Sequence, residues 1–257
     1  MNGISYTLFD PTGNMTVLAA MPDGPAECSR AAGRLFAAES TAEQVGFFSE
    51  EEEGPCLRMA GGEFCGNAAM CAAFLFLSRR GRDNGSVSVR FPDVGGTVGV
   101  SVSGRDDGTA CCTVEMPKPL SVGRESLDGG LALPVVRFPG ITHVILEAGK
   151  DDVRDLPAKV AGWCSGPDAR AFGVMVYDRR ADTLSPLVFV PGAGTLIWET
   201  ACASGTSALG AWLAAKSGRK VTISPLQPGG RLTVSASPDG EISLTGTVRA
   251  VRSGVLE

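Results

Sequence analysis

Two strongly apolar helical segments, about half a chain apart, constrain the fold more than any other feature of this 257-residue sequence. The pattern predicts one helix over residues 68–80, ended by Gly81, and another over residues 204–216, ended by Gly218. Glycine just past the last apolar residue is a common helix stop. The apolar residues of the first helix are not confined to one stripe, which predicts a helix buried on nearly all sides.

A loop of small residues that carries one cysteine leads into each of these helices. The first loop reads Glu-Phe-Cys-Gly-Asn-Ala-Ala and contains Cys65, and the second reads Glu-Thr-Ala-Cys-Ala-Ser-Gly-Thr and contains Cys202. The repeated arrangement suggests two similar halves, each presenting one cysteine at a helix N-terminus. We expect the chain to cross first from one half to the other at the Pro-Lys-Pro of residues 117–119.

Short strand-like stretches, bounded by turn residues, fill most of the remaining sequence. In the first half they are predicted at residues 4–8, 15–19, 45–48, 56–59, 86–91, 97–102 and 109–116. In the second half they are predicted at residues 135–138, 142–147, 173–178, 184–190, 221–224, 231–235 and 242–248. Two further helices are predicted, at residues 25–38 and 151–163. This mixture predicts an α+β fold.

The composition excludes several classes of protein. Hydrophobic residues make up 44% and charged residues 20% of the chain, as in ordinary globular proteins. The net charge of −5 and the lack of a basic patch argue against a nucleic-acid partner. The most apolar run, residues 68–77, is about half as long as a transmembrane helix. The N-terminus lacks the basic and apolar regions of a signal peptide. We therefore expect a cytoplasmic protein that does not associate with membranes.

The eight cysteines of a cytoplasmic chain are expected to be thiols. The sequence has no C-x-x-C pair, and His143 is its only histidine, so we predict neither a zinc site nor another metal site. Most of the cysteines are interpreted as small buried hydrophobic residues. Cys65 and Cys202 differ from the others because their positions before the two apolar helices match.

Helix N-termini give these two cysteines a chemical role. Free backbone N–H groups and the positive end of the helix dipole bind a carboxylate and lower the pKa of a nearby thiol. One thiolate can remove a proton from a carbon atom while the other thiol donates a proton to the opposite face. The reaction inverts the configuration without a cofactor when N–H groups stabilise the developing negative charge. We therefore predict Cys65 and Cys202 as an acid–base pair and predict no cofactor.

Five short motifs, in order along the chain, resemble the diaminopimelate epimerase superfamily of cofactor-independent amino-acid racemases. They are Gly13-Asn14, Glu43-Gln44, Cys65-Gly66-Asn67-Ala68, His143-Val144-Ile145 and Ala201-Cys202-Ala203-Ser204-Gly205. Within the superfamily, the chain is most similar to the histidine racemases of staphylopine-type metallophore pathways. The longer matching stretches are residues 11–16, 43–47, 63–68, 196–199, 202–206 and 227–230.

The resemblance implies a fold of two pseudo-symmetric halves, each a mixed β-sheet or barrel curled around a central helix. The active site of such a protein lies in the cleft between the halves. Residues 1–117, joined by a C-terminal strand at 247–257, would form the half that carries Cys65. Residues 118–246 would form the half that carries Cys202. The resemblance also implies a homodimer.

The same resemblance implies an isomerase that needs no pyridoxal phosphate. It would interconvert L- and D-histidine by two-base proton transfer at the α-carbon, for the biosynthesis of an opine metallophore. Cys65 and Cys202 would be the catalytic pair. The substrate-binding or supporting residues that the resemblance implies are Asn14, Glu43, Gly66, Asn67, Glu199, Ala203, Ser204 and Gly205.

Several positions depart from the pattern of diaminopimelate epimerases. Met70 stands where those enzymes usually have arginine, and Ile141-Thr142 where they have Asn-Pro. No arginine precedes Cys202 in the position of their Glu-Arg. Because some of these groups hold the distal charged end of diaminopimelate, and buried unpaired charge is costly, we expect poor activity on that substrate. In the closer family, Ala203 replaces a glycine, which matters only if the position needs a positive φ.

Other functions stay open from the sequence alone. A racemase or epimerase of another amino acid, including diaminopimelate or proline, would share the two-cysteine mechanism. Phenazine-type isomerases of the superfamily lack the thiol pair. The G-x-S-x-G, P-loop and G-x-G-x-x-G patterns of hydrolases and nucleotide-binding proteins are absent. The alternatives that are not enzymes are an amino-acid-binding protein and a thiol-redox or metal-thiolate protein.

Overall fold

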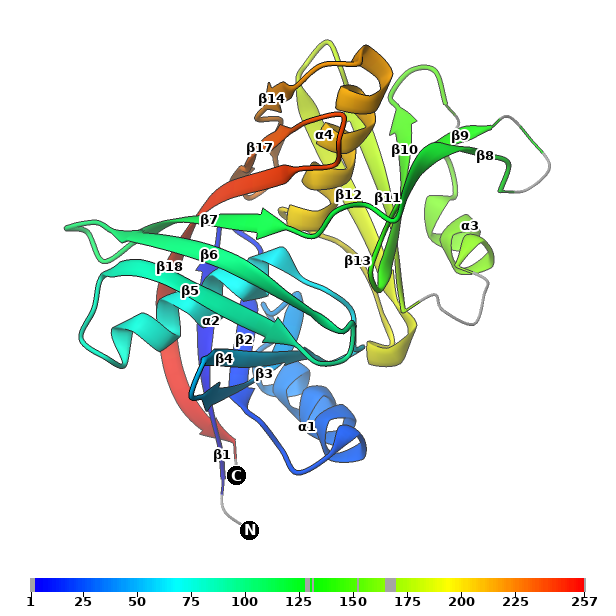
Figure 1. Ribbon diagram of the computed structural model, residues 1–257. Helices are drawn as coiled ribbons and strands as arrows, with labels where there is room; N and C mark the ends of the chain where they lie inside the picture. The colour runs from blue at the N-terminus through cyan, green and yellow to red at the C-terminus, as the bar shows by residue number, and fades with distance from the viewer. Residues whose placement is uncertain (1–2, 128–129, 131, 152, 165–169, 257) are drawn as a thin grey trace. The chain divides into compact units, whose positions relative to one another are not determined.

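The computed structural model describes residues 3–127, 130, 132–151, 153–164 and 170–256. The chain divides into two compact units, Met1–Glu115 with Thr245–Glu257 and Met116–Leu244. Most elements of both units are labelled in Figure 1. Each unit has its own apolar core and its own strongly apolar helix, so each can be described by itself.

The first unit is a ring of strands closed around a helix. Its helices are α1 (Pro25–Ala38) and α2 (Gly66–Ser78). Its strands are β1 (Ile4–Pro11), β2 (Thr16–Ala20), β3 (Gln44–Glu51), β4 (Gly54–Met59), β5 (Asn84–Phe91), β6 (Gly96–Gly104), β7 (Ala110–Met116) and most of β18 (Ile242–Leu256). They pair in the order β1-β2-β3-β4-β5-β6-β7-β18. Antiparallel pairing of β18 with β1, from Ile4 opposite Leu256 to Pro11 opposite Val248, closes the barrel.

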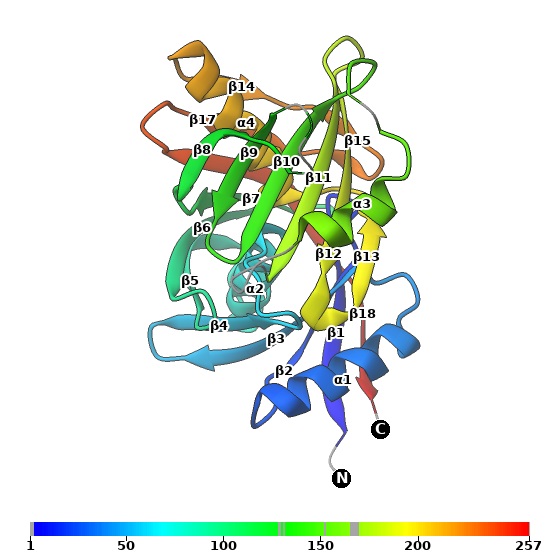
Figure 2. The same cartoon turned by 90° about the vertical axis from the view of Figure 1, so that its right-hand side faces the viewer.

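Helix α2 lies inside this barrel. The eight consecutive residues from Gly66 to Ala73 are all buried, and because they cover more than two turns, the whole circumference of the helix is buried. The helix packs against strands β1 to β6, as Figure 2 shows. This confirms the burial that its sequence pattern predicts. The many alanines of α2 keep the helix narrow, so that the strands can close around it.

Helix α1 covers the outer face of the same sheet (Figure 2). Side chains alternate between the two faces of a strand. In β1, Leu8 therefore packs in the cluster under α1, whereas the ring of Phe9 contacts Phe74 of α2 edge to face, with centroids 6.2 Å apart. In β3, Val45 and Phe47 belong to the cluster under α1. The other face of β1 and β3 is thus left for α2 and the residues at its N-terminus.

The second unit is a mixed sheet with a helix on each face. Its helices are α3 (Leu156–Trp163) and α4 (Ala203–Ser217). Its strands are β8 (Ser121–Glu125), β9 (Leu133–Phe138), β10 (Ile141–Glu147), β11 (Ala171–Asp178), β12 (Thr183–Val190), β13 (Thr195–Trp198), β14 (Val221–Ile223), β15 (Leu226–Gln227), β16 (Gly230–Arg231) and β17 (Thr233–Ala236). The main sheet has the order β16-β15-β12-β11-β10-β9-β8, and β13 pairs with β12.

The two faces of strand β10 pack against different helices. Val144 and Leu146 belong to the apolar cluster that packs against Leu156 and Val160 of α3. The alternate residues His143 and Ile145 face α4, and His143 contacts its first turn. Nine consecutive residues of α4, from Ala203 to Ala211, are buried. Like α2, this helix is therefore enclosed around its circumference at its N-terminal end.

Several predicted elements are confirmed, and others need correction. The helix at 25–38 and the hairpin of the first two strands are confirmed. The helix predicted at 68–80 begins two residues earlier. The one predicted at 151–163 begins only at Leu156, and residue 152 within it lies outside the described part of the chain. The strand predicted at 231–235 is two short strands, β16 and β17, and β8, β13 and β15 were not predicted at all.

No helix in the described part of the chain combines the length and the hydropathy that crossing a bilayer requires.

Candidate functional site

Cys65 caps the N-terminus of α2. Its backbone is extended, with φ −136° and ψ 113°, so the chain turns into the helix at the next residue. The sulfur accepts a hydrogen bond from the backbone N–H of Ala68 at 3.3 Å, which satisfies one of the free donors of the first turn. The thiol donates to Oε1 of Gln44 at 2.7 Å, and the cysteine is only 8% exposed. The sulfur is thus held in place by the helix and by β3.

A second group of predicted residues lies beside Gln44. The side-chain amide of Asn14 donates to Oε2 of Glu43 at 3.0 Å, and the backbone N–H of Glu43 donates to the carbonyl of Met15. Asn14 is completely buried. The structure therefore brings Asn14 and Glu43 together, next in the chain to the residue that contacts Cys65. Gly66 and Asn67, the first two residues of α2, are also buried.

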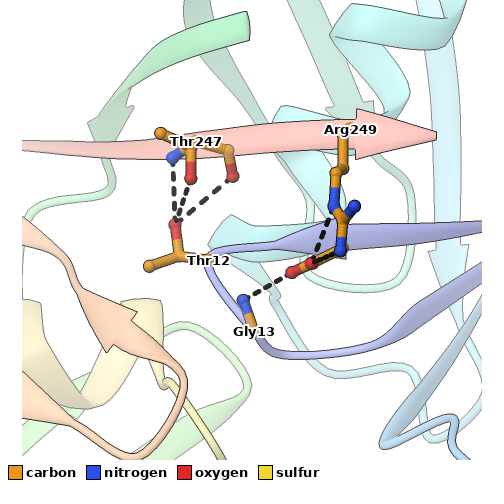
Figure 3. Close-up of polar contacts among 5 residues, drawn as sticks. Thr12, Gly13, Thr247 and Arg249 are labelled. Carbon is orange, nitrogen blue, oxygen red and sulfur yellow. Dashed lines mark hydrogen bonds and ion pairs between the residues drawn. The ribbon is translucent and has the colours of Figure 1, made fainter. Parts of the chain in front are cut away.

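The turn before Asn14 is fastened to the last strand, as Figure 3 shows. Thr12, at a φ of 55°, exchanges hydrogen bonds with Thr247: its hydroxyl accepts the backbone N–H at 2.9 Å. Asp10 accepts the N–H of Gly13 at 2.6 Å and the guanidinium of Arg249 at 2.9 Å. The positive φ of Thr12 is strained for a residue with a side chain. These bonds hold the strained turn and thereby position Asn14.

Cys202 caps α4 in the same way. Its φ of −116° and ψ of 111° are close to those of Cys65, and its sulfur accepts the backbone N–H of Gly205 at 3.4 Å. Its own backbone N–H donates to Oε1 of Gln227 at 2.9 Å. The Gln227 amide donates in turn to the hydroxyl of Thr206, which donates to the carbonyl of Cys202 at 2.7 Å. This ring of three buried residues fixes the cysteine backbone.

A series of buried polar side chains leads from β10 to the sulfur of Cys202. Nε2 of His143 lies 2.9 Å from the hydroxyl of Ser204, which lies 3.6 Å from the sulfur. His143 is fully buried, and burial lowers its pKa to about 3, so the imidazole is neutral at physiological pH. A neutral imidazole has one donor and one acceptor nitrogen. His143 therefore orients the Ser204 hydroxyl without bringing a charge to the site.

The expectation that a helix N-terminus lowers the thiol pKa is wrong for Cys202. Burial raises the pKa of this thiol well above its usual value, and the neighbouring carboxylate of Glu199 raises it further through its charge and a hydrogen bond. The N–H of Gly205 and the hydroxyl of Ser204 act in the opposite direction and are outweighed. Desolvation disfavours a thiolate more than one helix end favours it. Cys202 is thus a protonated thiol here.

Close packing beside Cys202 requires the glycine at position 205. A Cβ atom at Gly205 would lie 2.0 Å from Sδ of Met175 and 3.2 Å from the Cys202 sulfur. Ala203, where the closer family has glycine, is the first residue of α4 and has helical backbone geometry, so it needs no positive φ. The structure thus places Ala203, Ser204 and Gly205 in the first turn beside the sulfur, with Glu199 buried next to it.

Two glutamines that contact the cysteine backbone or sulfur were not predicted as site residues. Gln44 could have been found from strand alternation. Val45 and Phe47 of β3 face the apolar cluster under α1, and strand alternation therefore turns Gln44 to the opposite face. Gln227 carries no such signal, because β15 is only two residues long and its contact with α4 depends on tertiary packing.

The other cysteines support the interpretation made from the sequence. None of the eight, all of which are described, forms a disulfide, and six of them are buried. Burial raises the pKa of Cys112 to about 12 and that of Cys71 well above its usual value. In the described residues, no group of three or more histidine, cysteine and acidic side chains is placed to hold a metal ion.

Comparison with known proteins shows which family the sequence matches. The family model of the histidine racemase CntK N-terminal domain matches residues 3–256. A histidine racemase of Fusobacterium nucleatum is 34% identical over 222 residues, which are 83% of this chain and 81% of that relative. A histidine racemase of Staphylococcus aureus is 27% identical over 98% of this chain and 96% of that relative.

Solved structures share the fold at low identity. A predicted epimerase from Pseudomonas aeruginosa has a TM-score of 0.70 and 15% identity, and covers 98% of this chain and 99% of its own. A hydroxyproline epimerase from Agrobacterium vitis has a TM-score of 0.63 and 12% identity, and covers 100% of this chain and 94% of its own. A phenazine biosynthesis protein of Bacillus anthracis reaches a TM-score of 0.65 at 14% identity, with complete coverage of both chains.

Proposed function

Because the chain belongs to the histidine racemase family and is an isomerase of the amino-acid racemase class, we propose that it interconverts L- and D-histidine through the thiols of Cys65 and Cys202. The proposed substrate is the one named for the relatives from Fusobacterium nucleatum and Staphylococcus aureus. Racemases of other amino acids, among them diaminopimelate and proline, are the alternatives that experiment must exclude.

The observation that carries this proposal is the matched geometry of the two cysteines. Each caps a buried helix with extended backbone, and each sulfur accepts the N–H three residues further along, that of Ala68 or Gly205. The remaining N–H groups of each first turn are suited to a substrate carboxylate. A lone buried cysteine has no need of such a setting, and two of them in one chain favour a paired chemical role.

The proposed proton transfer conserves atoms and charge. One cysteine enters as thiolate, takes the α-proton and becomes a thiol, and the α-carbon holds the electron pair of the broken C–H bond. The other thiol then gives its proton to the opposite face and becomes a thiolate. Burial and Glu199 keep the Cys202 thiol protonated, which is the state that the proton donor requires. Backbone N–H groups stabilise the charge that develops on the substrate carboxylate.

In this proposal each half of the chain contributes one thiol to the same α-carbon. The halves are pseudo-symmetric, residues 1–117 with 247–257 and residues 118–246, and the chemistry needs no cofactor. Supporting residues in the first half are Asn14, Glu43, Gly66 and Asn67, and those in the second are Glu199, Ala203, Ser204 and Gly205. His143 acts through Ser204 as a positioning residue.

Exchange of the α-proton in D₂O tests the mechanism. With L-histidine and no added cofactor, the parent protein is expected to incorporate deuterium at the α-carbon and to yield D-histidine. Cys65→Ser and Cys202→Ser are each expected to lower the rate of racemisation at least 10³-fold, because an alcohol is a far weaker acid than a thiol. Cys111→Ser, a half-buried cysteine of β7, is the matched control and keeps the parent rate. Racemisation by either active-site variant at the parent rate contradicts the proposal.

A substrate panel tests the choice of amino acid. Histidine is expected to turn over faster than diaminopimelate, since Met70, a completely buried residue, offers no charged partner to a second ammonium–carboxylate end. Initial rates on L-histidine, LL-diaminopimelate, L-proline and L-alanine are compared at equal concentration. Faster turnover of another amino acid would keep the two-thiol mechanism and remove histidine as substrate.

We further propose that the protein acts in the cytoplasm as a homodimer and supplies D-histidine to an opine-metallophore synthase. The support is the relationship to the histidine racemases. Sedimentation equilibrium checks the oligomeric state, for which a mass of twice 26.5 kDa is expected. Deletion of the encoding gene, followed by analysis of metal-binding products in the medium, checks the pathway.

A further inference from the structure

The second unit contains a cavity of about 190 Å³ that the proposed reaction does not use. It lies along the C-terminal part of α4, where Leu209, Trp212 and Lys216 line it. Cys202 caps the other end of the same helix. Trp212 is ten residues further along, which corresponds to roughly 15 Å at the rise of an α-helix. The cavity is therefore distinct from the environment of the Cys202 sulfur.

The lining of the cavity has an excess of positive charge. Four cationic side chains contribute, Arg124 of β8, Lys150, Arg179 and Lys216, against two carboxylates, Glu147 and Asp151. The chain as a whole carries a net charge of −5, so this local sign is opposite to that of the molecule. Cations that gather around a cavity in an acidic protein attract an anion from solution.

Both carboxylates are already engaged within the cavity wall. Oε1 of Glu147 lies 2.6 Å from Nζ of Lys150, and Oδ2 of Asp151 accepts the backbone N–H of Glu147. Lys150 lowers the pKa of Glu147 most, and Lys216 and Arg179 also lower it, so these three cations lie close to one carboxylate. Among the residues that the structure describes, neither Arg179 nor Lys216 has a carboxylate within ion-pair distance.

The remaining wall is apolar and aromatic. Strand alternation turns Ile145 of β10 toward α4, where it lines the cavity with Leu209. Trp212 is half-buried, and the guanidinium carbon of Arg124 lies 6.0 Å from the centroid of its ring. Tyr177 forms a further aromatic part of the lining. A flat ring can lie against such a surface, while an anionic group attached to it meets the cations.

We infer that this cavity binds a small organic anion in which a phosphate or carboxylate group is attached to a flat ring, either directly or through a short linker such as a ribose. Arg179 and Lys216 bind the anionic group, and Trp212 packs against the ring. The volume of about 190 Å³ suits one ring system with its substituent. The site is separate from the proposed racemase chemistry and does not depend on it.

Titration of the full-length protein tests this inference. The probes are adenosine monophosphate and benzene-1,3-dicarboxylate. Inorganic phosphate, which has the charge but no ring, and adenosine, which has the ring but no charge, are the controls. Binding is followed by the indole ¹H–¹⁵N signal of Trp212. The chain has three tryptophans, and the signal of Trp212 is identified as the one that is missing in Trp212→Phe. At least one of the two ring anions is expected to bind with a Kd at least tenfold below those of phosphate and adenosine. The probe that binds shows whether phosphate or carboxylate is recognised.

Paired charge variants complete the test. The double variant Arg179→Ala/Lys216→Ala is expected to raise the Kd at least tenfold. Because both side chains are exposed, the variant is expected to fold normally, and an unchanged melting temperature checks this. Arg219→Ala with Lys220→Ala removes the same charge just beyond α4, outside the cavity lining, and is expected to leave the Kd unchanged. Equal weakening by both pairs, unchanged binding in the first pair, or no binding of either ring anion overturns the inference.

Discussion

At the scale of single residues, His143 makes the stability of the protein sensitive to pH. Its pKa is about 3 in the folded state, because it is fully buried, and near 6.5 when unfolded. Between these values the unfolded chain binds a proton that the folded chain does not. The free energy of unfolding therefore falls as pH is lowered through 6.5, by up to about 1.4 kcal/mol per pH unit. Urea midpoints measured from pH 7 to pH 5 check this.

Two variants isolate the contribution of the histidine. His143 is the only histidine of the chain, so His143→Gln is expected to flatten the slope of the urea midpoint between pH 5 and 7. Ser204→Ala removes the hydrogen-bond partner but leaves the buried imidazole, and the slope is expected to remain. An unchanged slope in His143→Gln would assign the pH dependence to other groups.

The residues of the candidate site differ in how far the sequence reveals them. Cys65 and Cys202 can be found because a cysteine before a buried apolar helix has a physical signature that recurs. Glu43 has none, since a carboxylate in a loop is indistinguishable from a solvated surface group until Asn14 is seen beside it. The pKa of Cys202 was misjudged because the sequence shows the helix end but not the burial or Glu199.

At the scale of elements, the first turn of α4 has no space for a larger residue. Gly205→Ala would place a methyl group against Met175, which is itself completely buried, so the side chain must repack. We expect a loss of about 1–3 kcal/mol in the free energy of unfolding. A lower rate of racemisation is also expected, because the same methyl group presses on the Cys202 sulfur. Urea unfolding and the exchange assay measure the two effects.

A glycine in another helix gives the matched control. Gly33 lies within α1, and a Cβ atom there would meet no other atom within 4 Å. Gly33→Ala is therefore expected to raise the free energy of unfolding by about 0.5–1 kcal/mol, through the lower entropy of the unfolded chain. Equal stability changes in the two variants would show that the packing at Gly205 is not limiting.

Elements were predictable where local pattern and tertiary environment agree. The helix Pro25–Ala38 has proline in its first turn and, apart from Gly33, mostly helix-forming residues, and both its ends were predicted correctly. Strand β8, by contrast, has the sequence Ser-Val-Gly-Arg-Glu, without alternation, and exists because it pairs with β9. Strand β18 continues past residue 248 through exposed residues, since β1 supplies its hydrogen-bond partners. Such pairings are not encoded locally.

At the scale of the whole molecule, an ion pair links the last strand to the first helix of the same unit. Glu39, at the end of α1, is 2% exposed and accepts hydrogen bonds from Arg252 of β18 and from the hydroxyl of Tyr6 at 2.7 Å. The Arg252 guanidinium holds the pKa of Glu39 below its usual range. Arg252→Met leaves this buried carboxylate with one partner, and we expect a loss on the order of 2 kcal/mol.

The control for this prediction is an ion pair on the surface of α1. Arg30 lies 3.8 Å from Glu27, and both side chains are more than half exposed. Arg30→Met is expected to change the free energy of unfolding by less than about 0.5 kcal/mol. Urea midpoints of the two variants provide the measurement. A similar loss of unfolding free energy in both variants would indicate that the burial of Glu39 does not strengthen its ion pair with Arg252.

The closure of the barrel by β18 also sets the order in which the protein can be completed during translation. Residues 116–244 form one uninterrupted unit, whereas the first unit needs the segment from Thr245 onward. Until that segment leaves the ribosome, β1 and β7 are open strand edges, which readily pair with other chains. The inserted unit is thus synthesised in full before the barrel that flanks it can close. The nascent chain carries these open edges through the synthesis of the whole inserted unit.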